Sequence, residues 1–265
     1  MEPLGTSRPL TARSVIASTL LGTYPPRLPS QLLVRSGELF GIAEGTIRTA
    51  ISRMVAAGEL EAIGTSYQLA GELLGRQARQ DASRLAAPRP WNGQWEMAIV
   101  VGERRAATAR TSLREAVRRL KLAELREGVW VRPQNLDPRR SPRDWAIVDG
   151  QCHTFAGAPV GDDRALVAEL WDLDAWAGGA DALLQGLDAL QPALERGDRP
   201  VLRDGFVLSA AVLRHLLADP LLPGELWPPD WPGEELRERY ERFDAAFKDV
   251  WRQWFRPEPD APPTP

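Results

Sequence analysis

Residues 37–60 read GELFGIAEGTIRTAISRMVAAGEL, and this stretch decides the fold of the first part of the chain. Its apolar residues recur at the spacings of three and four that one buried helix face requires. They are Ile47, Ala50, Ile51, Met54 and Val55. We therefore predict a helix over about residues 44–57, preceded by a tight turn at residues 41–43.

The opposite face of this predicted helix is suited to nucleic acid. Gly45, Thr49, Ser52 and Ala56 lie along its centre, and Thr46, Arg48 and Arg53 flank them. Small residues permit close approach to base edges, hydroxyl groups bond to bases or phosphates, and arginine forks onto guanine or phosphate. The stretch therefore predicts a helix that reads the major groove of DNA.

The flanking sequence completes a winged helix-turn-helix. An apolar stripe predicts a helix over residues 11–21, and a second helix is expected over 30–40 with Ser30 as its N-cap. Residues 60–63 and 67–69 form two short strands around Gly64-Thr65-Ser66, which is the expected wing. The predicted DNA contacts are Arg35, Thr46, Arg48, Thr49, Ser52, Arg53, Thr65, Ser66 and Tyr67.

Charge and tryptophan content divide the chain. Residues 1–89 hold ten basic and seven acidic residues, a net charge of +3, and the remaining 23 basic and 29 acidic residues give −6. Because binding to phosphates requires clustered cations, only the first part is expected to bind DNA. All ten tryptophans follow Pro90, which marks a boundary near residues 87–90.

The second part predicts a central sheet and a helical end. Strands are expected at 95–101, 128–132 and 152–156, with helices over 113–120 and after Asp163, an order compatible with a ferredoxin-like domain. Helices are also expected over 182–194 and 206–217. The spacing from Leu236 to Trp254 predicts a last helix, which packs on its own domain or contributes to a dimer seam.

We therefore predict an α+β protein with three domains. Residues 1–75 form a winged helix-turn-helix DNA-binding domain, and residues 76–90 a linker. Residues 91–175 form a ferredoxin-like central domain. Residues 176–265 form a mostly helical C-terminal domain for effector binding and dimerisation.

Several motifs resemble the PaaX family of transcriptional repressors. The stretch at 37–60 resembles that family's DNA-binding segment, and Trp91-Asn92-Gly93-Gln94-Trp95, Gly128-Val129-Trp130-Val131 and the tail Trp227-Pro228-Pro229-Asp230-Trp231-Pro232-Gly233 stand where the family has its equivalents. The resemblance implies that the central domain is similar to the ferredoxin-like proteins of CRISPR spacer integration. Some of those relatives carry a metal-binding Asp after the first strand, whereas this chain reads Val101-Gly102-Glu103-Arg104.

The resemblance also implies an aryl-acetyl coenzyme A effector, with phenylacetyl coenzyme A as the type ligand. An aromatic acyl group needs an aromatic-lined pocket, and the phosphates need arginine or lysine. The candidate effector residues are Trp130, Arg139, Arg140, Arg143, Trp171, Arg214, His215 and Trp227.

Catalytic chemistry is not expected. Cys152 and His153 are adjacent, so on a strand their side chains point to opposite faces. The pairs Asp162-Asp163 and Asp172-x-Asp174 are more typical of helix caps than of a cation site. We therefore expect no enzyme, no catalytic residue, no metal and no cofactor.

Two other function classes stay open. A metal-dependent nuclease on the central domain would depend on Asp162 or Glu103. A scaffold would bind a protein partner through its tryptophan-rich tail.

The expected function is repression of an aromatic-acid (phenylacetate-type) catabolic operon. The expected partners are double-stranded operator DNA, an acyl coenzyme A effector and a second copy of the chain, because paired heads reading half-sites multiply specificity. No stretch approaches the length of a spanning helix, and the first thirty residues lack a leader pattern, so a cytoplasmic protein without membrane contact is expected.

Overall fold

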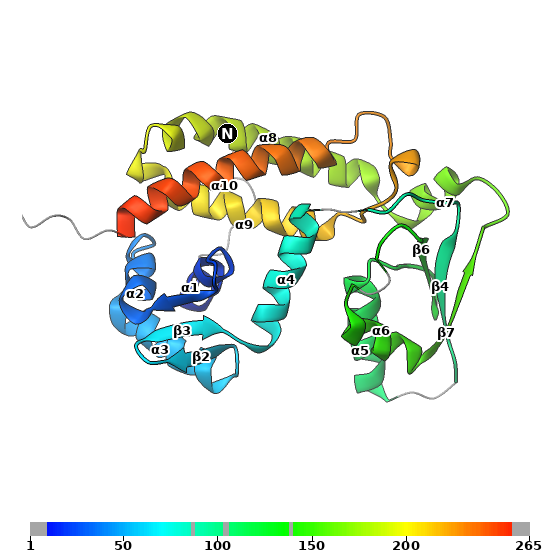
Figure 1. Ribbon diagram of the computed structural model, residues 1–265, viewed down its shortest axis with the longest axis horizontal. Helices are drawn as coiled ribbons and strands as arrows, with labels where there is room; N and C mark the ends of the chain where they lie inside the picture. The colour runs from blue at the N-terminus through cyan, green and yellow to red at the C-terminus, as the bar shows by residue number, and fades with distance from the viewer. Residues whose placement is uncertain (1–9, 86–87, 103–105, 138–139, 256–265) are drawn as a thin grey trace, which may run out of the picture. The chain divides into compact units, whose positions relative to one another are not determined.

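The chain has a mixed α and β fold with two antiparallel sheets (Figure 1). The structure, a computed structural model, describes residues 10–85, 88–102, 106–137 and 140–255. It divides into two compact units: unit 1 comprises residues 1–85, 179–217 and 232–265, and unit 2 comprises residues 86–178 and 218–231. This division differs from the three consecutive domains expected, because the C-terminal helices and the N-terminal head belong to the same unit.

The head of unit 1 comprises residues 10–85 and begins with three helices and a small sheet. In order these elements are α1 (Ala12–Leu21), β1 (Arg27–Pro29), α2 (Ser30–Glu38), α3 (Glu44–Ala56), β2 (Leu60–Ile63) and β3 (Ser66–Leu69). The strands pair antiparallel in the order β1-β3-β2. The predicted helices and hairpin strands are present within two residues of their expected bounds, whereas β1 was not predicted.

The predicted cap of α2 is wrong. Ser30 is the first residue of the helix, and Pro29 stands at the cap position without a side-chain hydrogen bond. The backbone N–H of Ser30 donates to the carbonyl of Thr65 at 3.0 Å. The chain therefore passes from β1 directly into α2. The carbonyl of Thr65 in the hairpin turn accepts from one of the N–H groups that have no partner within the first turn of a helix.

Gly37 explains how α2 and α3 pack. A Cβ at this position would lie 2.6 Å from Cγ1 and 2.7 Å from Cδ1 of Ile47. Ile47 itself is completely buried in the core of the head. Glycine weakens the interior of a helix, but here it permits the close approach that positions α3.

The segment 76–85, expected as part of a linker, is helical. It lies in α4 (Gly71–Leu85), whose buried side chains are Leu73, Gln77, Gln80 and Ser83. Gln77 donates through Nε2 to the carbonyls of Leu21 at 3.0 Å and Thr23 at 3.2 Å. The buried face of α4 is mostly polar, and one of its residues, Gln77, binds the end of α1. An apolar periodicity therefore did not reveal this helix.

Three long helices complete unit 1 (Figure 1): α8 (Leu173–Glu195) from residue 179 on, α9 (Leu202–Ala218) up to residue 217, and α10 (Gly233–Phe255). A short 3-10 turn, η1 (Arg199–Val201), precedes α9. The predicted stripe of α10 is buried within this unit: Leu236, Tyr240, Phe243, Phe247 and Val250 are all less than 9% exposed. These residues therefore pack within their own unit, which is the first of the two predicted roles of this helix.

Unit 2 contains a four-stranded sheet in the order β5-β6-β4-β7. Its elements are β4 (Trp95–Val100), α5 (Ala107–Arg119), β5 (Ala123–Arg126), β6 (Val129–Pro133), α6 (Pro142–Asp149), β7 (Cys152–Gly157), α7 (Asp163–Leu170), the start of α8 and the 3-10 turn η2 (Gly224–Leu226). Strands β4, β6 and β7 were predicted, but β5 and α6 were not. The second helix between the strands is therefore α6 rather than the helix after Asp163.

Each face of this sheet has its own core. On one face Ala98 and Trp130 pack with residues of α5 and α6, including Leu113 and Val148. On the other face Trp95 and Val131 pack with α7 and the segment 218–231. Because both faces are covered, neither side of β4 or β6 is polar throughout.

Candidate nucleic-acid interface and ligand pockets

Helix α3 has one buried and one exposed face. Ile47, Ile51 and Met54 are no more than 3% exposed and pack in the core of the head. The residues predicted to contact DNA on the other face, which are Thr46, Arg48, Thr49, Ser52 and Arg53, are all exposed. The structure thus brings five of the nine predicted DNA contacts onto one helical surface.

Polar contacts within α3 prepare this surface. The Thr49 hydroxyl donates to the Gly45 carbonyl at 2.8 Å, and the Ser52 hydroxyl donates to the Arg48 carbonyl at 3.1 Å. In this arrangement both hydroxyl oxygens keep lone pairs that can accept from a base amino group. The face therefore presents acceptors at its centre and guanidinium donors at its edges.

The two arginines of this face differ. Arg48 forms an ion pair with Glu44, one turn before it, at 2.6 Å. Arg53 has no hydrogen-bond or ion-pair partner in the described part of the chain. Exposed ion pairs one turn apart contribute only about 0.3–0.5 kcal/mol to stability. A phosphate or base can therefore compete with Glu44 for Arg48, and it would displace no residue from Arg53.

A concave surface of about 600 Å³ lies beside α3, between it and the start of α1. Thr46, Thr49 and Arg53 contribute to it from α3, and Arg13 contributes from α1. Arg13 is held by an ion pair with Glu59. The candidate DNA surface therefore extends from α3 onto the first turn of α1, which the sequence analysis did not include.

The three predicted contact residues of the hairpin differ in exposure. Thr65 is exposed at its tip, whereas Ser66 and Tyr67 are half-buried. Tyr67 packs against the core of the head, opposite Leu28 in the β1–β3 pairing. Of the three predicted wing residues, only Thr65 is fully available to a partner.

Arg35 lies away from the exposed face of α3. Its guanidinium carbon lies 5.1 Å from the ring centroid of Trp254 in α10, and the residue is half-buried. A cation over an indole face is a favourable contact. Arg35 therefore has a packing contact within unit 1, and its contact with DNA stays a prediction.

Two of the predicted effector residues, Trp171 and Trp227, line one cavity of about 400 Å³ in unit 2. Arg164 also lines it and donates to the carbonyl of Glu225 at 2.9 Å. Trp130 does not join them, since it lies in the core beneath α5 and α6.

The predicted arginine cluster of unit 2 is dispersed. Arg140 is largely buried and donates to the carbonyls of Leu120 and Asp137. Burial lowers the pKa of its guanidinium, and the carboxylates of Glu96 and Asp137 oppose this effect. Arg143 is exposed on α6, and Arg139 lies outside the described residues.

The remaining two effector candidates lie in unit 1. Arg214 is exposed and lines a cavity of about 240 Å³. His215 packs against Gly179 of α8, where an added Cβ would lie 2.7 Å from its Cε1 atom. His215 is therefore in a close-packed position where α8 approaches α9.

The residues considered for catalysis have structural surroundings. Cys152 is buried and His153 is exposed on β7, as adjacent strand residues should be. Asp162 accepts from the N–H of Arg164 at 2.9 Å as the N-cap of α7, and Asp172 accepts from the N–H of Ala175 at 2.9 Å. Within the described ranges no group of three or more His, Cys, Asp or Glu side chains could hold a metal ion, and Glu103 lies outside those ranges.

Among the described helices, none has both the length and the apolar character that crossing a bilayer requires.

Comparisons with known proteins cover nearly the whole chain. Three family models match: PaaX-like protein at residues 11–73, PaaX protein central Cas2-like domain at 88–146, and PaaX-like protein C-terminal domain at 171–256. The solved structure of the uncharacterized protein Rv0674 from Mycobacterium tuberculosis is similar, with 38% identity and a TM-score of 0.69. The match covers 92% of this chain and 98% of that one. No curated protein matches.

Proposed function

The chain belongs to the PaaX family, a family of transcriptional regulators of phenylacetic acid catabolism, and we propose that it is a DNA-binding repressor that an aryl-acetyl coenzyme A thioester releases from its operator. The observation that carries the proposal is the exposed face of α3. Hydroxyl groups lie at its centre and arginines at its edges, over a buried apolar face that holds the helix in place.

The head has the element order of a winged helix-turn-helix. Helices α2 and α3 are joined by a short turn, and the antiparallel hairpin of β2 and β3 follows α3. In such domains the second helix of the pair enters the major groove. We accordingly assign α3 as the recognition helix and the hairpin tip at Thr65 as the wing.

The order of elements in unit 2 favours a ferredoxin-like domain. Strand, helix, strand, strand, helix and strand follow one another from β4 to β7, and the first and third strands are central in the sheet. The matching family model is described as Cas2-like. We propose a role in binding and assembly for this domain, because Asp162 and Asp172, two of the acidic residues considered for chemistry, serve as helix caps.

The effector proposal rests on the family and on the cavity lined by Trp171 and Trp227. Aromatic walls suit the aryl group of the thioester. For the effector to release DNA, it must bind the free protein more tightly than the operator-bound protein. We further propose that the repressor acts in the cytoplasm as a homodimer, which reads two half-sites of one operator.

A fluorescence-anisotropy titration tests this function. The full chain is added, at one fixed salt concentration, to labelled intergenic DNA from beside its own gene and to a scrambled duplex of equal length. We expect tighter binding to the intergenic duplex, by a factor of at least ~10³, and loss of this binding when phenylacetyl coenzyme A is added. Coenzyme A alone serves as the matched ligand control.

Three outcomes separate the parts of the proposal. Equal affinity for the two duplexes would contradict the repressor function. Specific binding that the thioester does not change would keep the repressor and reject the effector. A stoichiometry of one chain per operator duplex, from the same titration at DNA concentrations well above the dissociation constant, would reject the dimer.

A further inference from the structure

The cavity of about 240 Å³ in unit 1 has chemistry that the proposed function does not use. Its walls come from α1 and α4 of the head and from α9 and α10 of the C-terminal helices. One part of the wall is aromatic and another is cationic.

The aromatic wall consists of Phe206, Phe247 and Trp251. The Trp251 ring is stacked on both phenylalanines, with centroids 5.7 Å from Phe206 and 5.4 Å from Phe247. Such a wall binds a flat apolar ring through offset or edge contacts.

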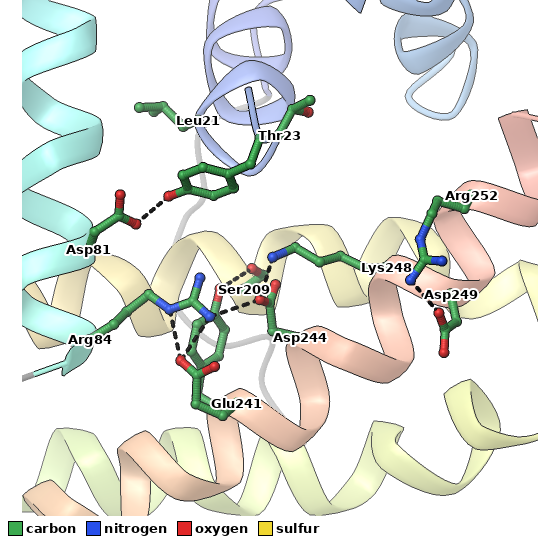
Figure 2. A network of polar contacts seen from close by, with 12 residues as sticks. Leu21, Thr23, Asp81, Arg84, Ser209, Glu241, Asp244, Lys248, Asp249 and Arg252 are labelled. Atoms are coloured by element: carbon green, nitrogen blue, oxygen red, sulfur yellow. Dashed lines mark hydrogen bonds and ion pairs between the residues drawn. The ribbon is translucent and has the colours of Figure 1, made fainter. Parts of the chain in front are cut away.

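Most charged groups at the cavity already have partners (Figure 2). Arg84 forms ion pairs with Glu241 at 2.7 Å and with Asp244 at 2.9 Å, and Lys248 binds the same Asp244 carboxylate at 2.7 Å. The hydroxyl of Tyr24 donates to Asp81. The cavity's two carboxylates are thereby occupied.

Arg76 and Arg214 lack such partners. Both side chains line the cavity, and neither has a hydrogen bond or ion pair with another residue among those that the structure describes. Arg76 is half-buried, and burial lowers the pKa of its guanidinium, with further lowering by the nearby cations Arg214, Arg13 and Arg79. A partly desolvated cation that faces other cations is unfavourable until an anion joins it.

We propose that this cavity binds a small aromatic carboxylate, with its carboxylate on Arg76 and Arg214 and its ring against Phe206, Phe247 and Trp251. Guanidinium groups match a carboxylate in charge and in fork geometry. The volume is below the range of ~300–1,000 Å³ that holds drug-sized ligands. One ring with one acidic group therefore fits, and an entire coenzyme A thioester does not.

This site goes beyond the proposed function, because its ligand is a free acid and binding requires no DNA. An effect of this ligand on DNA binding would, however, rest on the proposed function. The ligand would contact Arg76 of α4 in the head and Trp251 of α10 together, so it would favour whichever arrangement of the DNA-binding head this contact requires.

Isothermal titration calorimetry of the full chain without DNA tests the site. The probes are phenylacetate, its neutral analogue phenylacetamide, inorganic phosphate and phenylacetyl coenzyme A. We expect phenylacetate to bind with one site per chain, and phenylacetamide and phosphate each to bind at least tenfold more weakly. Phenylacetate should also bind normally to protein already saturated with the thioester.

Three variants locate the binding. Arg76→Met and Arg214→Met should each weaken phenylacetate binding tenfold to a hundredfold. Arg242→Met is the matched control, because Arg242 is exposed on α10 and does not line the cavity. It should leave the affinity unchanged. Arg214 is exposed, so its variant keeps the test valid if Arg76→Met unfolds.

Each contrary result overturns a stated part. Equal binding of phenylacetamide would reject recognition of the anion, and equal binding of phosphate would reject recognition of the ring. Unchanged affinity in both arginine variants would reject the location, competition by the thioester would reject a separate site, and no binding of phenylacetate would reject the site itself. Because DNA is not used, these failures are distinct from failure of the repressor function.

Discussion

Arg132 in unit 2 and Arg76 in unit 1 are both withdrawn from solvent, but only Arg132 is provided with acceptors. Arg132 is completely buried and donates to the carbonyls of Pro133 at 2.9 Å and Leu221 at 3.1 Å and to Asn135 Oδ1 at 2.7 Å. Its Nε atom lies 3.4 Å from a Glu96 carboxylate oxygen. Arg76 has no such contact with any residue that the structure describes. Arg132 therefore stabilises the fold of unit 2, whereas the Arg76 guanidinium is available to bind an anion.

Replacing Arg132 should have the largest effect on folding. Arg132→Met removes the closer of the two ion-pair partners of Glu96 and the donor to the Pro133 carbonyl and to Asn135 Oδ1. Removal of one partner from a buried charged pair costs about 3–5 kcal/mol. We expect a loss of this size in the free energy of unfolding of unit 2, measured by differential scanning calorimetry. Arg126→Met on the exposed strand β5 is the control, with an expected change below about 0.5 kcal/mol. If the two variants have equal stability, Arg132 does not complete the fold.

Arg53 extends the comparison to an exposed arginine without a partner. Arg53→Ala should leave stability almost unchanged and reduce operator affinity by about 1–3 kcal/mol if the side chain reads a guanine. If it binds phosphate instead, affinity should fall evenly for specific and scrambled duplexes, and the salt dependence should decrease. Arg48→Ala should behave similarly, with a smaller loss because Glu44 must first be displaced.

Anisotropy titrations at several salt concentrations measure these losses. Arg110→Ala on the exposed part of α5 provides the control and should leave operator affinity unchanged. Full operator affinity in both α3 variants would reject α3 as the recognition helix.

Arg76 should respond with the opposite sign to Arg132. Arg76→Met keeps the apolar stem and removes a partly desolvated cation that Arg214 and Arg13 repel. The free energy of unfolding should therefore stay the same or rise by up to about 1 kcal/mol in urea titrations without ligand. A loss comparable with that of Arg132→Met would mean that Arg76 has a structural partner, and the contrast between the two arginines would fail.

Glu96 sharpens the comparison through pH, with the smallest expected effect. Burial raises the pKa of its carboxyl group above the ordinary value of 4.5, although Arg132 and Arg140 oppose this shift. The unfolded chain therefore releases this proton first, and the contribution of Glu96 to stability falls as pH rises from about 4.5 through the raised folded pKa. Glu96→Gln should flatten that part of the profile, measured by urea unfolding between pH ~4.5 and ~7.5. Parallel profiles for the two proteins would contradict the shift.

The sequence predicted the elements whose burial is apolar and periodic. Helix α3 was placed to within one residue because Ile47, Ile51 and Met54 repeat at helical spacing. Helix α4 was missed because Gln77, Gln80 and Ser83 form most of its buried face. Because this buried face is polar, the sequence of α4 does not show apolar residues repeating at helical spacing.

The candidate sites were predicted unequally for a related reason. The exposed residues of α3 belong to one helix, so their spacing alone placed them on one surface. The cavity of unit 1 joins Arg76 to Arg214, which are far apart in sequence and come together only through packing of α4 with the C-terminal helices. Trp171 and Trp227 line one cavity and Trp130 lies in a core, but nothing in the spacing of the three tryptophans separated them.

The close contact between Gly37 and Ile47 has a consequence for protein engineering. Because the inner face of α3 is fixed against α2, and its outer residues touch little else, randomised libraries at Thr46, Thr49, Ser52 and Arg53 should yield mostly folded variants. New operator preferences could then be selected directly. A library that includes position 37 should instead return glycine almost invariably, since even one methyl group there would push against the helix that carries the selected residues.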